Sequence, residues 1–338
     1  MVKLEKRLDA FIALGKLIQE LGHDQKLSLF DQIENQNNWF TPRQSNLALQ
    51  GILNYLSPKK ITSWVAKYSF SNPFSTRRIG IIMAGNLPAV GFHDLLCVLM
   101  AGHKAHIKLS SSDQVLLPWL GSQLLRVEPA FEDYIVYSER LNGLDAYIAT
   151  GSDNSARYFN FYFGKYPHII RKNRTSVAVV DGRETIKDWE LLAKDIFHYF
   201  GLGCRNVSKV FFSNQNQLSG FLEGMGPEKR VMDHHKYLNN YEYNKSIYLI
   251  NGEPHLDNGH LLLKESKESV SPIAVIYYEI YRNKEDLERK LQEAGDKIQC
   301  VVSRNGWYPG SIAFGQAQCP DVDDYADKVD TMKFLLTL

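Results

Sequence analysis

The sequence predicts an α/β protein built on a parallel sheet with helices on both faces. From about residue 78 onward, short apolar runs that resemble buried strands alternate with amphipathic helical patterns, and this alternation is typical of parallel sheets. The chain has 338 residues, enough for two domains, with 44% hydrophobic and 23% charged residues, as in ordinary globular proteins. We expect ligands of such a sheet to bind at the carboxyl ends of its strands.

Charge and composition exclude several classes of function. Lys and Arg number 39 against 38 Asp and Glu, so we expect no nucleic-acid partner. The amino-terminal segment, residues 1–7, is charged and has no apolar region typical of a secretory signal. No apolar run reaches the roughly 20 residues that a membrane span needs. We therefore expect a cytoplasmic protein with no membrane span.

The first 70 or so residues carry helical patterns. Apolar residues recur at helical spacing from Leu4 to Leu21, and Thr41-Pro42 and Ser57-Pro58 each place a capping residue before a helix-starting proline. Helices are thus expected over 42–56 and 58–68. Asn72-Pro73 predicts a turn at the end of this region.

The remaining elements are expected as follows. Strands are expected over 78–83, 105–109, 146–150, 175–180 and 207–212, and helices over 88–101, 113–125, 153–163 and 186–200. Later, 247–250 and 261–264 suggest antiparallel strands around an Asn251-Gly252 turn. A strand over 273–281, a helix over 284–293 and a strand over 298–302 complete the pattern.

Cys204 is a candidate nucleophile. It follows Gly201-Leu202-Gly203 at the end of the helical run 189–200, and Arg205 comes directly after it. Glycines allow close approach of a substrate to the backbone, and a neighbouring cation favours the reactive thiolate. The alternative is a small buried hydrophobic residue, as the core pattern around Cys97 indicates for that cysteine.

Two segments follow the first two strands of the expected sheet. Asn86, in Ala84-Gly85-Asn86-Leu87-Pro88, could hold a developing oxyanion or could cap the next helix. Lys108, with Ser110 and Ser111, suits a phosphate or ribose, although a lysine that merely ends an edge strand would look the same.

Two further segments belong to later strands. Gly151 and Ser152, in Thr150-Gly151-Ser152, suit an anion or form a plain strand-to-helix connection with a serine cap. Glu268, in Glu268-Ser269-Val270-Ser271-Pro272, could reach a ribose or could simply be solvated. His234, His235, His255 and His260 fit no common zinc spacing, so no metal is expected.

The order Gly-Asn-x-Pro, Lys-x-Ser-Ser, Thr-Gly-Ser, Gly-x-x-Cys and Glu-x-x-x-Pro resembles the aldehyde dehydrogenase superfamily. More narrowly, the helical prelude, the Lys108–Asp113 segment and the Lys328-Val329-Asp330 stretch are similar to the bacterial fatty acyl-CoA reductases of the LuxC type. The resemblance implies that Cys204 is the nucleophile and that Asn86 holds the oxyanion. It also implies that Lys108 and Glu268 contact the cofactor riboses and that Gly151 and Ser152 lie beside the dinucleotide.

Two departures from the superfamily pattern bear on the reaction. Hydrolytic aldehyde dehydrogenases carry a glutamate base before the cysteine, but the matching segment, residues 169–173, holds no acid. The family glutamine two residues before the cysteine is replaced by Leu202. The resemblance therefore implies NAD(P)H-dependent reduction of a fatty acyl thioester, presented by CoA or acyl carrier protein, to an aldehyde. A CoA-independent aldehyde dehydrogenase and a non-catalytic acyl-binding subunit are the alternatives.

The expected domain organisation follows from the same resemblance. Residues 1–75 form a helical region packed on the cofactor domain, and 76–196 form the dinucleotide-binding domain. Residues 197–310 form the catalytic cysteine domain, and 311–338 form a carboxyl-terminal segment. NADPH is expected over NADH, because Ser111 stands where NAD-specific relatives tend to carry a glutamate. We also expect a homo-oligomer.

Overall fold

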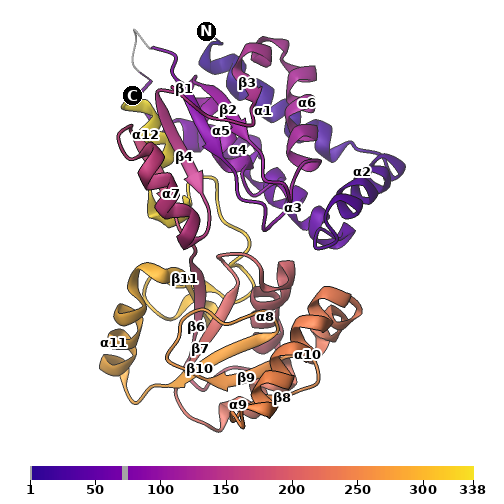
Figure 1. The fold of residues 1–338 in the computed structure, drawn as a ribbon, viewed down its shortest axis with the longest axis vertical. Helices are drawn as coiled ribbons and strands as arrows, with labels where there is room; N and C mark the ends of the chain where they lie inside the picture. The colour runs from indigo at the N-terminus through magenta and orange to yellow at the C-terminus, as the bar shows by residue number, and fades with distance from the viewer. Residues whose placement is uncertain (1, 71–74) are drawn as a thin grey trace. The chain divides into compact units, whose positions relative to one another are not determined.

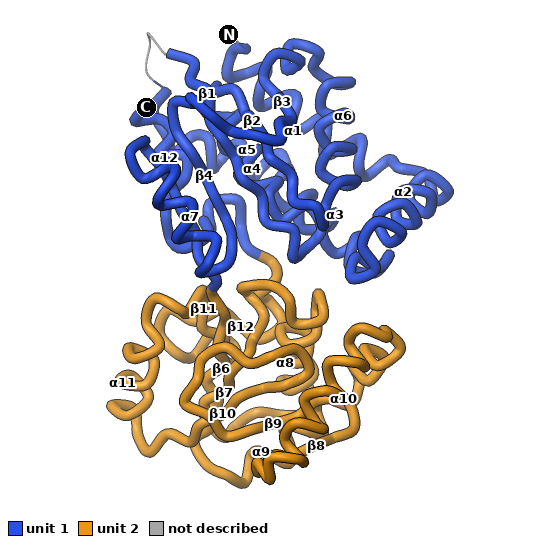
Figure 2. Tube along the Cα trace, in the orientation of Figure 1, with its two compact units in different colours: residues 1–173, 320–338 blue, residues 174–319 orange. Residues whose placement is uncertain are grey.

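The computed structural model describes residues 2–70 and 75–338. The expected Asn72-Pro73 turn lies outside the described residues. The chain divides into two compact units, residues 1–173 with 320–338 and residues 174–319 (Figure 2). The chain thus passes from one unit to the other twice, and the last 19 residues (338 − 319 = 19) belong to the first unit.

Unit 1 is built on a five-stranded parallel sheet with strand order β3-β2-β1-β4-β5 (Figure 1). Its strands are β1 (Arg78–Ile82), β2 (Lys104–Lys108), β3 (Ile135–Tyr137), β4 (Ala146–Thr150) and β5 (His168–Arg171). Because β2 and β4 flank β1 on opposite sides, the strand order reverses beside β1, and such a switch point is the usual ligand site of an open parallel sheet.

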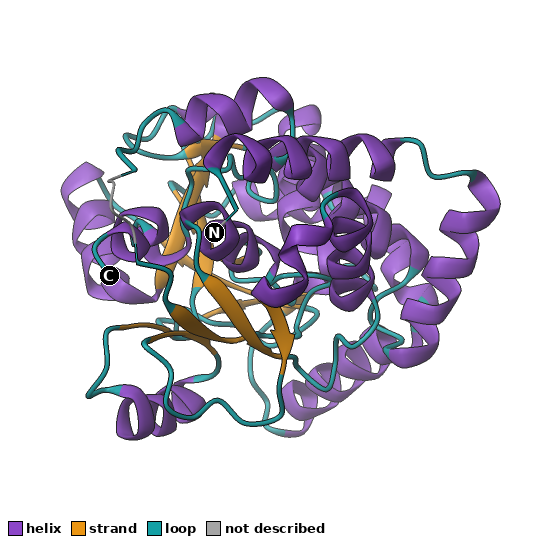
Figure 3. Ribbon diagram, turned by 90° about the horizontal axis from the view of Figure 1, so that it is seen from above, coloured by secondary structure: helices purple, strands orange, loops and turns teal. Residues whose placement is uncertain are grey.

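Helices lie on both sides of the strands (Figure 3). Tyr147 of β4 stacks on Phe163 at a centroid distance of 4.2 Å, so one face of the sheet is covered by α7. The short helix α5 is almost entirely buried and packs against α12 and α1. The helices of unit 1 are α1 (Leu4–Gln19), α2 (His23–Gln36), α3 (Pro42–Tyr55), α4 (Pro58–Val65), α5 (Phe92–Ala101), α6 (Leu116–Val127), α7 (Asp153–Phe163) and α12 (Thr331–Leu336).

Unit 2 contains a seven-stranded sheet with strand order β12-β11-β6-β7-β10-β9-β8. All its pairings are parallel except that of β8 with β9. The strands are β6 (Thr175–Val180), β7 (Val207–Phe212), β8 (Leu256–Asp257), β9 (Leu262–Glu265), β10 (Val275–Ile280), β11 (Ile298–Ser303) and β12 (Ile312–Ala313). The helices are α8 (Ile186–Phe197), α9 (Gln217–Gly224), α10 (His235–Ile250) and α11 (Lys284–Ala294).

The expected α/β fold with a parallel sheet is confirmed, but one expected element is wrong. Residues 247–250, which suggested a strand, form the last turn of α10. The antiparallel pair of this region is instead β8 with β9. In addition, β6 and α8, which the sequence assigned to the dinucleotide-binding range, belong to unit 2. Within the described residues, no helix is long and apolar enough to cross a membrane.

Candidate active site

The residues expected to form the site fall into two groups, one in each unit. Asn86, Lys108, Ser110, Ser111, Gly151 and Ser152 belong to unit 1, and Cys204 and Glu268 belong to unit 2. Each group is described by itself below.

In unit 1, the expected residues follow the carboxyl ends of three neighbouring strands. Asn86 follows β1, the segment after Lys108 follows β2, and Gly151 follows β4, so the loops flank the switch point of the sheet. The first two loops touch, because a Cβ atom added to Gly85 would overlap the side chain of Ser110. Glycine is thus required where the Asn86 loop crosses the loop after β2.

Asp113 fastens the Asn86 loop. Its buried carboxylate accepts the N–H of Ala89 at 2.6 Å and also the N–H groups of Leu116 and Leu117 at the start of α6. Burial raises the pKa of Asp113 to about 6. Helix α5 begins only at Phe92, with Gly91 in the capping position, so Asn86 is not the cap of that helix.

The loop after β2 is supported by the end of α2. The side chain of Gln36 donates to the carbonyl of Ser111 at 2.7 Å, and that of Asn37 donates to the carbonyl of Ser112 at 3.1 Å. Lys108 and Ser111 have exposed side chains, whereas the Ser110 hydroxyl accepts the N–H of Ser112 at 3.2 Å. The helical prelude therefore holds the backbone of this loop, with the side chains of Lys108 and Ser111 at its surface.

The segment after β4 contains a helix cap. The hydroxyl of Ser152 accepts the N–H of Ser155 at 3.2 Å and so caps α7. A Cβ atom on Gly151 would lie 2.9 Å from both Ser155 and Phe159, so this position needs glycine for close packing. The serine-cap interpretation of Ser152 is therefore correct, and a contact of Ser152 with an anion stays a prediction.

In unit 2, Cys204 lies in a tight turn before the amino end of β7. The N–H of Asn206 donates to the carbonyl of Gly203 at 3.0 Å, which closes the turn Gly203–Asn206 around the cysteine. Cys204 is half-buried, whereas Cys97 is fully buried in α5 and its burial raises the pKa of its thiol. The candidate nucleophile thus lies between a helix and the amino end of a strand, as its position in the sequence predicted.

The residues between α8 and Cys204 have an unusual backbone. Helix α8 ends at Phe197 instead of Phe200, and Tyr199, Phe200 and Gly201 have φ angles of 52°, 55° and 79°. A left-handed conformation costs about 1–2 kcal/mol for each residue that is not glycine. The ring of Phe200 packs against His234 and Tyr237, at centroid distances of 4.5 and 6.2 Å, and these contacts help to hold the segment.

Glu268 lies in the loop between β9 and β10, and β7 holds this loop from two consecutive positions. The hydroxyl of Ser208 donates to the carbonyl of Ser269 at 2.8 Å, and the ammonium of Lys209 donates to the carbonyl of Lys267 at 3.0 Å. The side chain of Glu268 is exposed. The strand that follows Cys204 therefore also positions the segment that carries Glu268.

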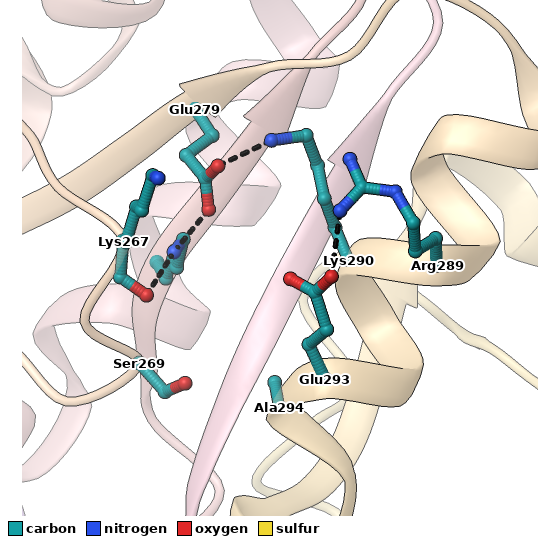
Figure 4. A pocket seen from close by; sticks show the side chains of 8 residues that line it. Lys267, Ser269, Glu279, Arg289, Lys290, Glu293 and Ala294 are labelled. Atoms are coloured by element: carbon teal, nitrogen blue, oxygen red, sulfur yellow. Dashed lines mark hydrogen bonds and ion pairs between the residues drawn. The ribbon is translucent and has the colours of Figure 1, made fainter.

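A cavity of about 340 Å³ lies beside this loop (Figure 4). Glu279 of β10 accepts from Lys209 at 2.6 Å and from Lys290 of α11, and burial lowers the pKa of Lys209. Arg289 pairs with Glu293 at 2.6 Å. Because Glu279 pairs with both Lys209 and Lys290, these three side chains form an ion network that anchors Lys209 and thereby the loop.

The segment that would hold a hydrolytic base lies at the end of β5. Arg171 is buried there, and its guanidinium donates to Asp94 at 2.6 Å and to Thr331 at 3.0 Å. The negative charge of Asp94 raises the pKa of Arg171 against the opposing effect of burial. This position binds the carboxyl-terminal segment and offers no proton acceptor.

The histidines make local hydrogen bonds. His234 accepts the N–H of Tyr237 and caps α10, His260 contacts the carbonyl of Met225 at 3.0 Å, and His255 contacts that of Glu253 at 2.9 Å. Among residues 2–70 and 75–338, no group of three His, Cys, Asp or Glu side chains is arranged to hold a metal ion.

Sequence reasoning missed three polar residues around the cysteine turn, Ser176, Asp195 and Asn206, all of them buried. Asp195 had a detectable signal, because it interrupts the buried stripe of α8 between Leu192 and Ile196. Ser176 and Asn206 had none, since their roles depend on contacts that only the folded sheet creates.

Comparison with known proteins identifies the fold. No protein-family model and no curated protein matches the sequence. Solved structures do match: an NADP-dependent enzyme of E. coli aligns with a TM-score of 0.66 and 10% identity over 89% of this chain and 73% of that one. An aldehyde dehydrogenase of Mycobacterium tuberculosis complexed with NAD+ gives 0.62 and 12%, over 89% and 73%.

A third structure, aldehyde dehydrogenase 21 of Physcomitrella patens in complex with succinate, covers 98% of this chain and 87% of its own, with a TM-score of 0.63 and 11% identity. The agreement extends over nearly the whole chain and includes both sheets. The chain therefore has the α/β fold of the aldehyde dehydrogenases.

Proposed function

We propose that this protein is an acyl-thioester reductase that forms an acyl-cysteine at Cys204 and releases an aldehyde. The observation that carries the proposal is the hydrogen-bonded turn Gly203–Asn206, which holds a half-buried cysteine at the amino end of β7 in this fold. The resemblance to LuxC-type fatty acyl-CoA reductases supports a fatty acyl substrate. The thioester donor would be CoA or acyl carrier protein.

The chemistry assigned to the chain's own residues is acyl transfer. The Cys204 thiolate attacks the thioester carbon, and Asn86 and the backbone N–H of Cys204 hold the oxyanion. The oxyanion then collapses, the bond to the CoA sulfur breaks, and that sulfur leaves as a thiolate that takes up a proton. The acyl group remains on Cys204 as a new thioester.

The loops of unit 1 fit a dinucleotide. Three loops flank the switch point of a parallel sheet, and Gly85 and Gly151 occur where a Cβ atom would collide with a neighbour. Lys108, Ser110, Ser111, Gly151, Ser152 and, from unit 2, Glu268 are the residues proposed to hold it. A reduced nicotinamide, when bound, supplies the hydride that converts the acyl group to the aldehyde.

The alternative functions differ in the fate of the acyl group. A CoA-independent aldehyde dehydrogenase needs a base to activate water, and Arg171 at the corresponding place is positively charged and paired with Asp94. A non-catalytic acyl-binding subunit would need no hydrogen-bonded turn around Cys204. The structure therefore favours the reductase over both alternatives.

The first test follows the acyl group. Incubation with radiolabelled acyl-CoA should label the wild type stoichiometrically and should leave Cys204→Ala unlabelled, while Cys319→Ala, which removes an exposed cysteine, should label normally. NADPH should then discharge the label as aldehyde. Label retained by Cys204→Ala would refute the assignment, and label released as free acid without NADPH would favour the hydrolytic alternative.

The second test concerns the cofactor. The matching structures include an NADP-dependent enzyme and a complex with NAD+, so the preference must come from this chain's own residues. The neutral Ser111 and the side chain of Lys108, both exposed, can bind a 2′-phosphate, which a carboxylate would repel. Ser111→Glu should therefore lower kcat/KM for NADPH at least tenfold and shift the preference toward NADH, whereas Ser111→Ala should not reverse it. A wild type that uses NADH as well as NADPH would contradict the argument.

A further inference from the structure

Two buried side chains hold the backbone on either side of Cys204. One is Asn206, whose side chain is 2% exposed, and the other is Ser176 of β6, which is fully buried. Neither residue belongs to the motifs that suggested a catalytic role, and neither is needed to extend a strand or a helix.

Asn206 joins the cysteine turn to the end of α8. Its Oδ1 accepts the N–H of Gly203 at 2.8 Å, and its Nδ2 donates to the carbonyls of Asp195 at 3.0 Å and His198 at 2.8 Å. One amide group thus fixes the Leu202–Gly203 peptide, which precedes the peptide that carries the N–H of Cys204, and it also fixes the carbonyl of His198, which directly precedes the left-handed segment. Any relaxation of Tyr199–Gly201 would have to break these bonds.

Ser176 fixes the peptide after Cys204. Its hydroxyl donates to the carbonyl of Cys204 at 3.0 Å, and its oxygen lies 3.0 Å from the sulfur of Cys300. Because the hydroxyl proton is used by a carbonyl that can only accept, the Cys300 thiol must be the donor to Ser176. Burial raises the pKa of the Cys300 thiol, against the opposing effect of its contact with Ser176.

We propose that Asn206 and Ser176 are positioning residues that aim the backbone N–H of Cys204 at the oxyanion before the substrate binds. The peptide groups on both sides of that N–H are fixed, so its direction is determined by the folded protein. This inference rests on the proposed function, in which the N–H of Cys204 stabilises the oxyanion. An oxyanion donor is effective because it needs no reorganisation during the reaction.

The test uses two variants, each with a matched control. Asn206→Ala is compared with Asn244→Ala, since Asn244 is also buried and donates to two carbonyls, those of Asn240 and Ile273. Ser176→Ala is compared with Ser303→Ala, a fully buried serine at the carboxyl end of β11. Both controls lose a buried polar side chain from unit 2 and keep the contacts of the cysteine turn.

Asn206→Ala and Ser176→Ala should each lower the rate of acylation of Cys204 by about 10- to 100-fold, with KM for the acyl thioester within about threefold of wild type. The controls should stay within about threefold for both constants. Because a smaller folded fraction would also lower the apparent rate at an unchanged KM, each rate is normalised to the folded fraction, measured by circular dichroism. If Ser176→Ala and Asn206→Ala both acylate as fast as their controls, the inference is wrong.

Hydrogen exchange provides a readout that does not depend on the reaction. The segment 202–206 of Asn206→Ala should exchange its amides at least tenfold faster than in Asn244→Ala, because the N–H of Gly203 loses its acceptor. Unchanged exchange would overturn the inference even if activity fell. If the wild type takes up no acyl label but the exchange rates differ as expected, the proposed function fails and the backbone role of Asn206 stands.

Discussion

At the residue scale, Asp195 links the cysteine turn to a distant part of unit 2. Its carboxylate accepts the N–H groups of Gly315 at 2.7 Å and Ala317 at 3.0 Å, and its backbone carbonyl accepts from Asn206. The carboxylate is buried, and burial raises its pKa to about 7, although both N–H groups favour its ionised form. Because the pKa of Asp195 differs between the folded and the unfolded protein, the free energy of unfolding depends on pH.

Stability should fall as pH rises from about 4 to about 7 because of Asp195. The pKa in the folded state is about 7 and the unfolded value is 3.8, so within this window the folded protein binds a proton that the unfolded chain releases. Between pH 5 and pH 8 the contribution amounts to at most about 3 kcal/mol. Asp195→Asn cannot titrate, although it loses one N–H contact at every pH.

Urea unfolding at pH 5 and pH 8 measures this effect. The wild type should be more stable than Asp195→Asn by a wider margin at pH 5 than at pH 8. Glu190→Gln, which removes an exposed carboxylate from the same helix, controls for general charge effects. A margin that is equal at both pH values would show that Asp195 does not take up a proton on folding.

At the scale of elements, periodicity and capping signals predicted most of the architecture. The buried strands β1, β2, β4, β6 and β7 were expected within one or two residues, and so was the proline-started helix α3. The short edge strand β3, of three residues, and β5, of four, were missed. Such short strands carry too few residues to show a pattern, and their pairing with neighbours creates them.

Helix α10 shows why one prediction was wrong. Its apolar side chains are distributed around the helix, with Ile250 80% exposed and Tyr248 buried, so no apolar face was visible in the sequence. Short apolar runs such as residues 247–250 fit a strand and a helix equally well. The end of α8 is a related case, because Tyr199 and Phe200 continue the helical pattern but adopt left-handed backbone angles.

The candidate site could be predicted only in part, because some of its residues act through contacts between strands that no local pattern shows. The order of short motifs indicated Cys204, Asn86 and Lys108, since each stands at a junction between a strand and a neighbouring element. The contacts of Asn206 and Ser176 cross from one strand to the next, and no local pattern encodes them. The helix-cap alternative for Ser152 was visible in the sequence because capping is a local property.

At the scale of the whole molecule, unit 2 is inserted between two parts of unit 1, because the chain leaves at residue 173 and returns at 320. The returning segment is fastened to unit 1 by several polar contacts. Trp64 donates to Tyr325 at 2.7 Å, His103 contacts the carbonyl of Leu335 at 2.9 Å, and Arg171 donates to Thr331. The stability of unit 1 should therefore depend on the last residues of the chain.

Leu335→Ala tests this dependence in the full-length protein. Leu335 of α12 is fully buried, and α12 packs against α5, so the substitution removes a core side chain and should lower the unfolding free energy of unit 1 by about 2–5 kcal/mol. Val329→Ala, at a position 40% exposed, should change this free energy by no more than about 0.5 kcal/mol.

Native-state hydrogen exchange of the β1 and β4 amides in unit 1, compared with those of β7 in unit 2, reports the two units separately. The amides of β1 and β4 should exchange faster in Leu335→Ala than in the wild type. Any increase in the exchange rate of the β7 amides measures how strongly the two chain crossings couple the units. If the amides of β1 and β4 keep their wild-type protection, the carboxyl-terminal segment is not part of the stable core of unit 1.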